Sequence, residues 1–231
     1  MAATVRALIF DMDGTMIDSM GHHRQSWIEF ARRHAIEIEV DELMRRTTGR
    51  TGAECMNELF GREFTRDESW ALIAEKEGIY RALFAPVFRE VLGFRAFAAT
   101  AHERGLAIGV GTAGDRHNIA FALQSLSMQP VPRVIVGGDE GLAGKPEPAI
   151  FLEVARRLGM DPAHCVVFED APFGIEAARR AGMWAVAVCT GHSAQDLAGP
   201  HVLAAIDDYE CPAALALLQR LTAPENAHHA A

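Results

Sequence analysis

The sequence has no apolar segment that approaches the roughly 20 residues needed for a membrane-spanning helix. Its first apolar run, residues 5–10, is too short for a signal peptide and leads directly into a group of acidic residues. We therefore expect a cytoplasmic protein with no signal peptide and no membrane contact.

Cysteine is scarce, and no two cysteines have the Cys-x-x-Cys spacing of zinc or redox sites. The composition argues against a disulfide framework, so we expect reduced and mostly packed thiols. Histidine also lacks metal-ligand spacing, since His22-His23 and His228-His229 are merely adjacent pairs. The four cysteines are Cys55, Cys165, Cys189 and Cys211.

Positive charge is in deficit, with 22 basic and 31 acidic residues and a net charge of −9. Acidic and basic residues are interspersed, which argues against a nucleic-acid-binding surface. The negative net charge does not exclude an anionic substrate, because a bound cation and one lysine can set the local electrostatic field. With 231 residues, 49% of them hydrophobic, the chain can bury a large core in one or two domains.

Two carboxylates follow the first apolar run, in the sequence Asp11-Met12-Asp13-Gly14-Thr15. If residues 5–10 form a buried strand, these carboxylates lie at its carboxyl end, where open α/β sheets bind ligands. A carboxylate there can act as a nucleophile, transfer protons or hold a hard cation. The alternative is an ordinary Asp/Gly turn after a strand.

Other polar residues follow further strand-like runs, which we predict at residues 106–111, 133–137, 165–168, 184–188 and 201–205. Thr112 and Ala113 follow one of them, and Glu169-Asp170 follows another. Lys145 lies in a Pro-bounded loop, Gly-Lys-Pro-Glu-Pro. Taken singly, these residues are also explained as a structural threonine, an acidic helix start and a solvated lysine.

Residues 17–92 show helical spacing and no clear strand, with helices predicted at 26–35, 41–46, 52–59 and 66–84. We therefore predict an α/β fold with a doubly wound, mostly parallel, Rossmann-like sheet formed by residues 1–16 and 93–231. Residues 17–92 would form an inserted all-helical cap domain over the strand ends, with hinges near residues 16–19 and 86–93.

The ordered set of Asp11-x-Asp13, Thr112, Lys145 and Glu169-Asp170 resembles the haloacid dehalogenase superfamily of phosphotransferases. The sequence around Lys145 and Glu169-Asp170 is similar to that of the branch that contains β-phosphoglucomutase and small sugar-phosphate phosphatases. Ala171 departs from the serine that often follows the Glu-Asp pair, and we expect this change to tune activity.

The resemblance implies Mg²⁺-dependent phosphoryl transfer through an aspartyl-phosphate. Asp11 would be the nucleophile and Asp13 the general acid and base. Lys145 would supply positive charge, and Thr112 would give a hydroxyl to the phosphoryl group. The implied Mg²⁺ ligands are the Asp11 side chain, the Asp13 carbonyl and the Asp170 side chain, with Glu169 bound directly or through water.

Substrate choice is expected to come from the cap and from the loop after Thr112. The candidates are His23, Thr48, Arg50, Ala113, Arg116 and Asn118. Arg50 is either a contact for an anionic group or a surface residue. Apolar cap residues are expected in its core, namely Met20, Trp27, Met44, Met56, Phe60 and Trp70. Lys76 is expected on a charged Glu-Lys-Glu helix face, far from the hinge.

Three functions follow from this pattern. The first is a phosphatase for a small phosphorylated metabolite, a sugar or polyol phosphate, acting as a monomer or alternatively a dimer. The second is a β-phosphoglucomutase-type mutase, which Gly52 opposes because the mutase loop carries an arginine there. The third is a non-catalytic regulator, although every catalytic position is filled. Asp13 and the carboxylates expected to bind Mg²⁺ argue against dehalogenase chemistry.

Overall fold

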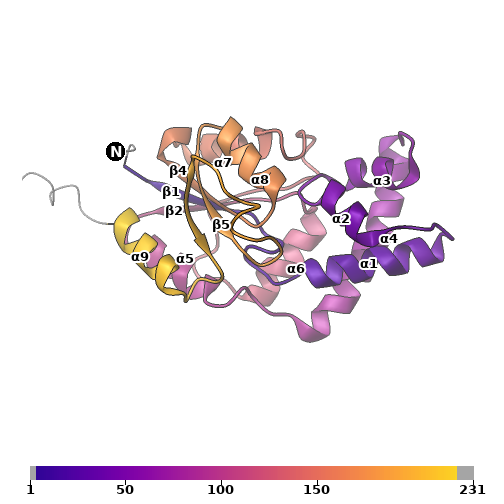
Figure 1. Ribbon diagram of the computed structural model, residues 1–231, viewed down its shortest axis with the longest axis horizontal. Coiled ribbons are helices and arrows are strands. Elements are labelled where there is room, and N and C mark those ends of the chain that lie inside the picture. The colour runs from indigo at the N-terminus through magenta and orange to yellow at the C-terminus, as the bar shows by residue number, and fades with distance from the viewer. Residues whose placement is uncertain (1–3, 223–231) are drawn as a thin grey trace, which may run out of the picture.

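A six-stranded parallel sheet forms the centre of the computed structural model, which describes residues 4–222 apart from the side chain of Arg66 (Figure 1). Its strand order is β3-β2-β1-β4-β5-β6. The strands are β1 (Ala7–Phe10), β2 (Ala107–Gly111), β3 (Val134–Val136), β4 (Cys165–Glu169), β5 (Trp184–Val188) and β6 (Val202–Ile206). The predicted doubly wound α/β fold is confirmed.

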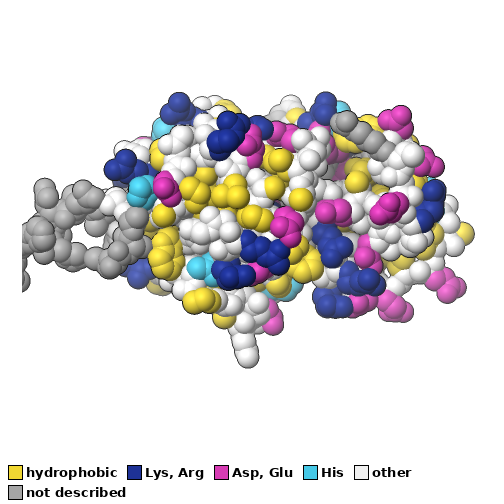
Figure 2. Space-filling view, turned by 90° about the horizontal axis from the view of Figure 1, so that it is seen from above, with side chains coloured by type: hydrophobic (Ala, Val, Ile, Leu, Met, Phe, Trp, Pro, Cys, Tyr) yellow, Lys and Arg dark blue, Asp and Glu magenta, His cyan; other side chains and the backbone are white. Residues whose placement is uncertain are grey.

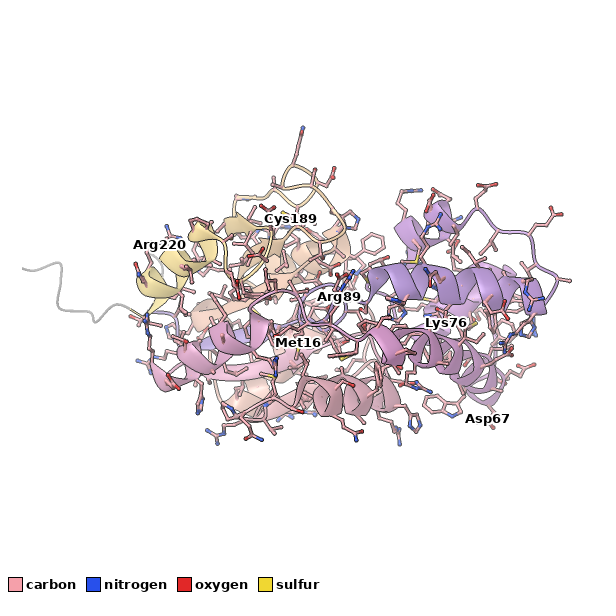
Figure 3. The ribbon with its side chains drawn as sticks, turned by 90° about the horizontal axis from the view of Figure 1, so that it is seen from below. Met16, Asp67, Lys76, Arg89, Cys189 and Arg220 are labelled. Carbon is pink, nitrogen blue, oxygen red and sulfur yellow. The ribbon has the colours of Figure 1, made fainter. Side chains whose placement is uncertain are left out.

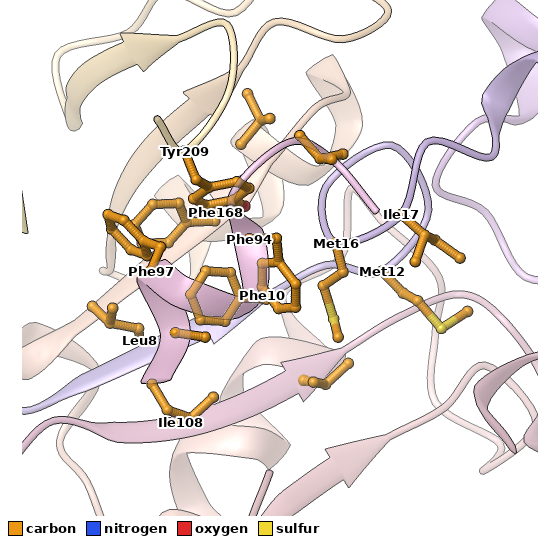
Figure 4. Close-up of a cluster of buried hydrophobic side chains, with 14 of the residues drawn as sticks. Leu8, Phe10, Met12, Met16, Ile17, Phe94, Phe97, Ile108, Phe168 and Tyr209 are labelled. Atoms are coloured by element: carbon orange, nitrogen blue, oxygen red, sulfur yellow. The ribbon is translucent and has the colours of Figure 1, made fainter. Parts of the chain in front are cut away.

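Both faces of the sheet are covered, which explains why β1 is apolar at every position. Successive side chains of a strand point to opposite faces. Leu8 and Phe10 accordingly join the core on one face (Figure 4), and Ala7 and Ile9 join the core on the other. The first core contains residues of α5 (Phe94–Glu103), α6 (Arg116–Leu126) and α9 (Pro212–Leu221); the second contains residues of α7 (Ala149–Leu158) and α8 (Pro172–Arg180).

Four α-helices follow β1 in the sequence and lie at one end of the molecule (Figure 1). They are α1 (Met20–Arg33), α2 (Val40–Thr47), α3 (Gly52–Phe60) and α4 (Arg66–Phe84), and we call residues 20–84 the helical insert. The insert has an apolar core of its own, which includes Trp27, Phe30 and Met56. Capping boxes formed by Thr51 with Glu54 and by Thr65 with Glu68 begin α3 and α4.

Two connections join the insert to the sheet and run side by side. The Val91 amide donates to the Met16 carbonyl at 3.0 Å, and the Asp18 amide donates to the Arg89 carbonyl at 3.1 Å. Figure 3 shows Met16 and Arg89 at this junction, beside the short helix η1 (Ala85–Val87) that follows α4. The two predicted hinge segments therefore lie side by side and are joined by backbone hydrogen bonds.

Several expectations need adjustment. Helix α1 begins at Met20, six residues before the predicted start, because its first turn carries polar residues that hid the helical pattern. Trp70 is 37% exposed and lies outside the insert core, with the Arg116 guanidinium over its ring. The His228-His229 pair falls outside the described residues. No helix in residues 4–222 is long and apolar enough to cross a membrane.

Candidate active site

Three neighbouring strands end at one cavity of about 100 Å³, which lies between the sheet and the helical insert. Asp11 follows β1, Thr112 follows β2, and Glu169 and Asp170 stand at the end of β4. Because β1 pairs with both β2 and β4, these residues meet at the same edge of the sheet. The insert contributes the opposite wall, including His23, Trp27, Thr48, Arg50 and Lys76.

Lys145 joins two of the carboxylates. Its Nζ donates to Asp11 Oδ1 at 2.5 Å and to Glu169 Oε1 at 2.6 Å. The side chain is 1% exposed, so Lys145 is not a solvated loop lysine. The ammonium between two carboxylates has a raised pKa, because burial, which lowers it, is outweighed by the attraction of Asp11 and Glu169.

Three buried carboxylates, those of Asp11, Glu169 and Asp170, have oxygen atoms within 4.8 Å of one another. Burial is the main cause that raises the pKa of Asp11 to about 7, against the lowering effect of Lys145. Burial, with repulsion from Glu169 and Asp11, raises the pKa of Asp170 well above its usual range. The cluster therefore has more negative charge than Lys145 can balance.

A divalent cation fits this cluster. Three carboxylates surround one ammonium, so the cluster would carry two excess negative charges when all of them are ionised. Asp170 Oδ2 is buried and has no hydrogen-bond partner in the described structure, as expected of an atom that serves a cation. Mg²⁺ prefers such oxygen ligands. Glu169 is already engaged, since its Oε1 accepts from Lys145 and its Oε2 accepts from the Ala171 amide at 2.7 Å.

The close approach of the two acidic segments depends on glycine. Gly14 has φ of +79°, and a Cβ there would overlap the Asp170 carboxylate. The turn after Asp13 can therefore pass directly beside Asp170 only without a side chain at position 14.

Asp13 lies beside the cluster but has different partners. Its Oδ1 accepts from Ser19 Oγ at 2.7 Å, from His23 Nε2 at 3.0 Å and from Tyr80 Oη at 3.2 Å. Burial raises the pKa of Asp13, but His23, Ser19 and the charge of Lys76 outweigh it, so the pKa lies below its usual value. Two carboxylates two residues apart thus have pKa values shifted in opposite directions.

Lys76 is not where we expected it. Its side chain is 3% exposed, and its Nζ lies 2.8 Å from His23 Nδ1 and 2.9 Å from Glu77 Oε1. The prediction of a charged surface position far from the hinge was wrong, because Lys76 lies on the buried face of α4. An ammonium can only donate, so Nδ1 of His23 accepts and its Nε2 carries the proton donated to Asp13.

Most of the predicted substrate residues line the cavity, namely His23, Thr48, Arg50, Ala113 and Asn118. Arg116 does not line the cavity, and its guanidinium forms an ion pair with Asp139 at 2.6 Å. Asn118 is held by Arg81 and Glu77, which lie on α4 of the insert.

Arg50 reaches across to the sheet domain, where its guanidinium lies 5.4 Å from the ring centre of Phe173 on α8. Cys55 also lines the cavity, but burial raises the pKa of its thiol to about 12, which leaves it unreactive. Sequence reasoning missed Ser19, Tyr80 and Phe173.

The comparisons with known proteins all point to the same family. The family model for haloacid dehalogenase-like hydrolases matches residues 5–182. The chain is 32% identical over 198 residues to validoxylamine A 7'-phosphate phosphatase of Streptomyces hygroscopicus subsp. limoneus, covering 86% of this chain and 92% of that protein. It is 33% identical over 184 residues to a fructose-1-phosphate phosphatase of Escherichia coli, covering 78% and 95%. It is also 30% identical over 192 residues to β-phosphoglucomutase of Bacillus subtilis, covering 81% and 84%.

A solved structure supports the fold independently. β-Phosphoglucomutase from Clostridium difficile superposes with a TM-score of 0.80 and 23% identity, covering 95% of this chain and 97% of that one.

Proposed function

The chain belongs to the haloacid dehalogenase-like hydrolases, and from that membership we propose that it is a Mg²⁺-dependent phosphatase for a small sugar or polyol phosphate. The observation that carries the proposal is the buried cluster of Asp11, Lys145, Glu169 and Asp170 at adjoining strand ends. The relatives named as phosphatases for small phosphorylated polyhydroxy compounds favour this substrate class. We further propose a cytoplasmic enzyme that acts as a monomer.

Asp11 is the nucleophile in this proposal. Its free carboxylate oxygen attacks phosphorus, an aspartyl-phosphate forms, and the bond to the leaving oxygen breaks. Lys145 holds Asp11 Oδ1 and places positive charge beside the transferring group. Asp13 gives a proton to the leaving oxygen and then takes one from the water that hydrolyses the aspartyl-phosphate, so the products are the free alcohol and inorganic phosphate.

Asp11, Asp170 and the Asp13 carbonyl would hold Mg²⁺, and Glu169 would act through water because Lys145 and Ala171 already occupy its oxygens. When bound, the ion reduces the repulsion between the nucleophile and the phosphoryl oxygens. Thr112 is 1% exposed, and its Oγ1 accepts from the Gly114 amide, which fixes the loop where a phosphoryl oxygen would lie.

The helical insert is proposed to be a cap domain that opens to admit substrate. The cavity of about 100 Å³ is smaller than the roughly 300–1,000 Å³ of ordinary ligand pockets. It has room for a phosphoryl group but not for a whole sugar phosphate. The insert and the sheet domain must therefore separate during turnover, and the paired connections at Met16 and Val91 are the proposed hinge.

The relative named β-phosphoglucomutase keeps a mutase as the second candidate. Gly52 argues against a mutase, because a Cβ at this position would lie only 3.0 Å from the Ile73 side chain. An arginine at position 52, as in the mutase loop, would have to displace the start of α3 or Ile73.

A panel of phosphate esters, assayed with and without Mg²⁺, tests the proposal. Release of inorganic phosphate together with the free alcohol supports a phosphatase. Formation of an isomeric phosphate ester without inorganic phosphate indicates a mutase. No conversion of any ester, with a folded protein, indicates a regulator. Asp11→Asn, which keeps the shape of the side chain, is the matched control in each assay.

A further inference from the structure

The loop after β5 touches both acidic segments of the site, although neither sequence motif includes it. Thr190 Oγ1 donates to the Gly14 carbonyl at 2.6 Å, and His192 Nδ1 lies 2.9 Å from the Asp170 carbonyl. A carbonyl oxygen only accepts, so Nδ1 of His192 carries the proton and donates. Cys189, labelled in Figure 3, directly precedes this loop.

Residues 190–192 are well placed to fix the distance between these segments. The Cys189 amide donates to the Ile206 carbonyl of β6, which anchors one end of the loop. Leu197, which is fully buried against the core, anchors the other end. Since Gly14 packs directly against the Asp170 carboxylate, a small shift of either backbone would change the separation of the metal-binding oxygens.

We propose that Thr190 and His192 are positioning residues that clamp the Asp11–Gly14 turn and Asp170 at the spacing required by Mg²⁺. This inference rests on the proposed function, because it assumes that the carboxylate cluster holds the ion. Neither side chain lines the cavity, so both act through the backbones they hold and neither touches the substrate. Partners that orient ligands in this way typically influence metal affinity roughly 10- to 100-fold.

The test is the dissociation constant for Mg²⁺, measured by calorimetry on the full chain without substrate. Thr190→Val removes the hydroxyl donor while keeping the shape, and His192→Ala removes the ring donor. Each should raise the dissociation constant at least about 10-fold. Thr190→Ser keeps a hydroxyl and His192→Asn keeps an N–H near the Nδ1 position, so both should bind Mg²⁺ like the wild type.

The chain offers matched controls away from the cluster. His201 Nε2 also lies 2.9 Å from a backbone carbonyl, that of Ile175, and Thr100 Oγ1 donates to the Ala96 carbonyl at 2.8 Å. His201→Ala and Thr100→Val remove equivalent hydrogen bonds, so they should leave Mg²⁺ affinity unchanged. Urea unfolding of each variant, measured at the temperature of the Mg²⁺ titration, verifies that all of them are folded under those conditions.

The outcomes separate the clamp from the site itself. Weaker Mg²⁺ binding in Thr190→Val and His192→Ala alone supports the clamp. Affinity within about two-fold of wild type in both variants overturns it while the metal site stands. Equal weakening in His201→Ala also overturns it, since general loosening then explains the effect. A wild-type protein that binds no Mg²⁺ overturns the proposed metal site and the clamp together.

Discussion

Lys76→Met should destabilise the protein through charge rather than through packing. Lys76 is buried, and its Nζ lies 2.9 Å from Glu77 Oε1. At an effective dielectric constant of about 20, the Coulomb attraction alone is about 6 kcal/mol, before the cost of desolvating both groups is subtracted. Methionine keeps the length of the chain but leaves Glu77 without its ammonium partner. Removing one member of a buried pair costs about 3–5 kcal/mol. Because Asn118 still donates to Glu77, we expect about 3 kcal/mol, at the lower limit.

The pH dependence distinguishes charge from packing. In the wild type, burial is outweighed by Lys76 and other partners, so the pKa values of Glu77 and Asp13 lie below their usual values. Their contribution to stability is complete above the unfolded pKa values, 4.5 and 3.8, and is lost only as pH falls through the lower folded values. The wild type should therefore show little change between pH 7 and pH 5 from these groups.

In Lys76→Met the folded pKa of Glu77 rises, so protonation relieves the stranded charge as pH falls. Each pH unit below that raised pKa restores up to about 1.4 kcal/mol until the unfolded pKa is reached. Urea unfolding at pH 7 and pH 5 measures this, and the loss of stability should be smaller at pH 5. The double variant Lys76→Met/Glu77→Gln should recover most of the loss at pH 7. An equal loss at both pH values, with no recovery in the double variant, would refute the reasoning.

Three further predictions concern activity. Asp11→Asn should abolish turnover while the unfolding midpoint in urea stays close to that of the wild type; substantial remaining activity would rule out the covalent mechanism. Chelator should remove activity and Mg²⁺ should restore it, whereas Ca²⁺, with its longer and more numerous ligands, should inhibit; full rates with Ca²⁺ alone would contradict the proposed cluster. Arg50→Ala should lower kcat/KM for the preferred sugar phosphate with little effect on p-nitrophenyl phosphate, and Phe173→Ala should reproduce part of this change through the contact at 5.4 Å. If both esters fall equally in kcat/KM, Arg50 stabilises the closed insert and does not recognise substrate.

The sequence predicted the fold and the strand-end residues because both depend on local patterns. Strand β5 has the predicted bounds, 184–188, and α4 spans the predicted 66–84. Short apolar runs bounded by polar residues report buried strands, and parallel strands that are neighbours in the sheet bring their ends together. The sequence therefore predicts that Asp11, Thr112 and Asp170 lie together.

Lys76 could have been placed correctly from the same sequence. It lies three residues after Ile73 and four before Tyr80, so it shares their face of α4. Both neighbours are buried. Lysine also occurs only twice in the chain, at positions 76 and 145, while arginine supplies the remaining positive charge. The Glu-Lys-Glu pattern is typical of a charged surface, but the helical period places Lys76 on the buried face of α4.

Other contacts could not be obtained from local pattern. Tyr80 reaches Asp13 across 67 positions and Thr190 reaches Gly14 across 176. Such pairs depend on how the insert and the β5 loop pack in three dimensions. The ion pair of Arg116 with Asp139 is a similar case, since it joins the start of α6 to the segment after β3.

The partners of Asp13 link its charge to the position of the insert. Of the three groups that donate to Asp13 Oδ1, His23 lies on α1 and Tyr80 on α4. Lys76, which fixes the proton of His23, is also on α4. Movement of the insert away from the sheet would remove these groups together and would also let water reach Asp13, so its pKa would move back toward the usual value of an aspartate. In the proposed mechanism, a closed insert thus favours the Asp13 carboxylate that activates water. Asp11 is held by Lys145, which also binds Glu169, and neither residue belongs to the insert, so the environment of Asp11 depends less on closure. The opposite pKa shifts of the two carboxylates therefore reflect attachment to different parts of the fold.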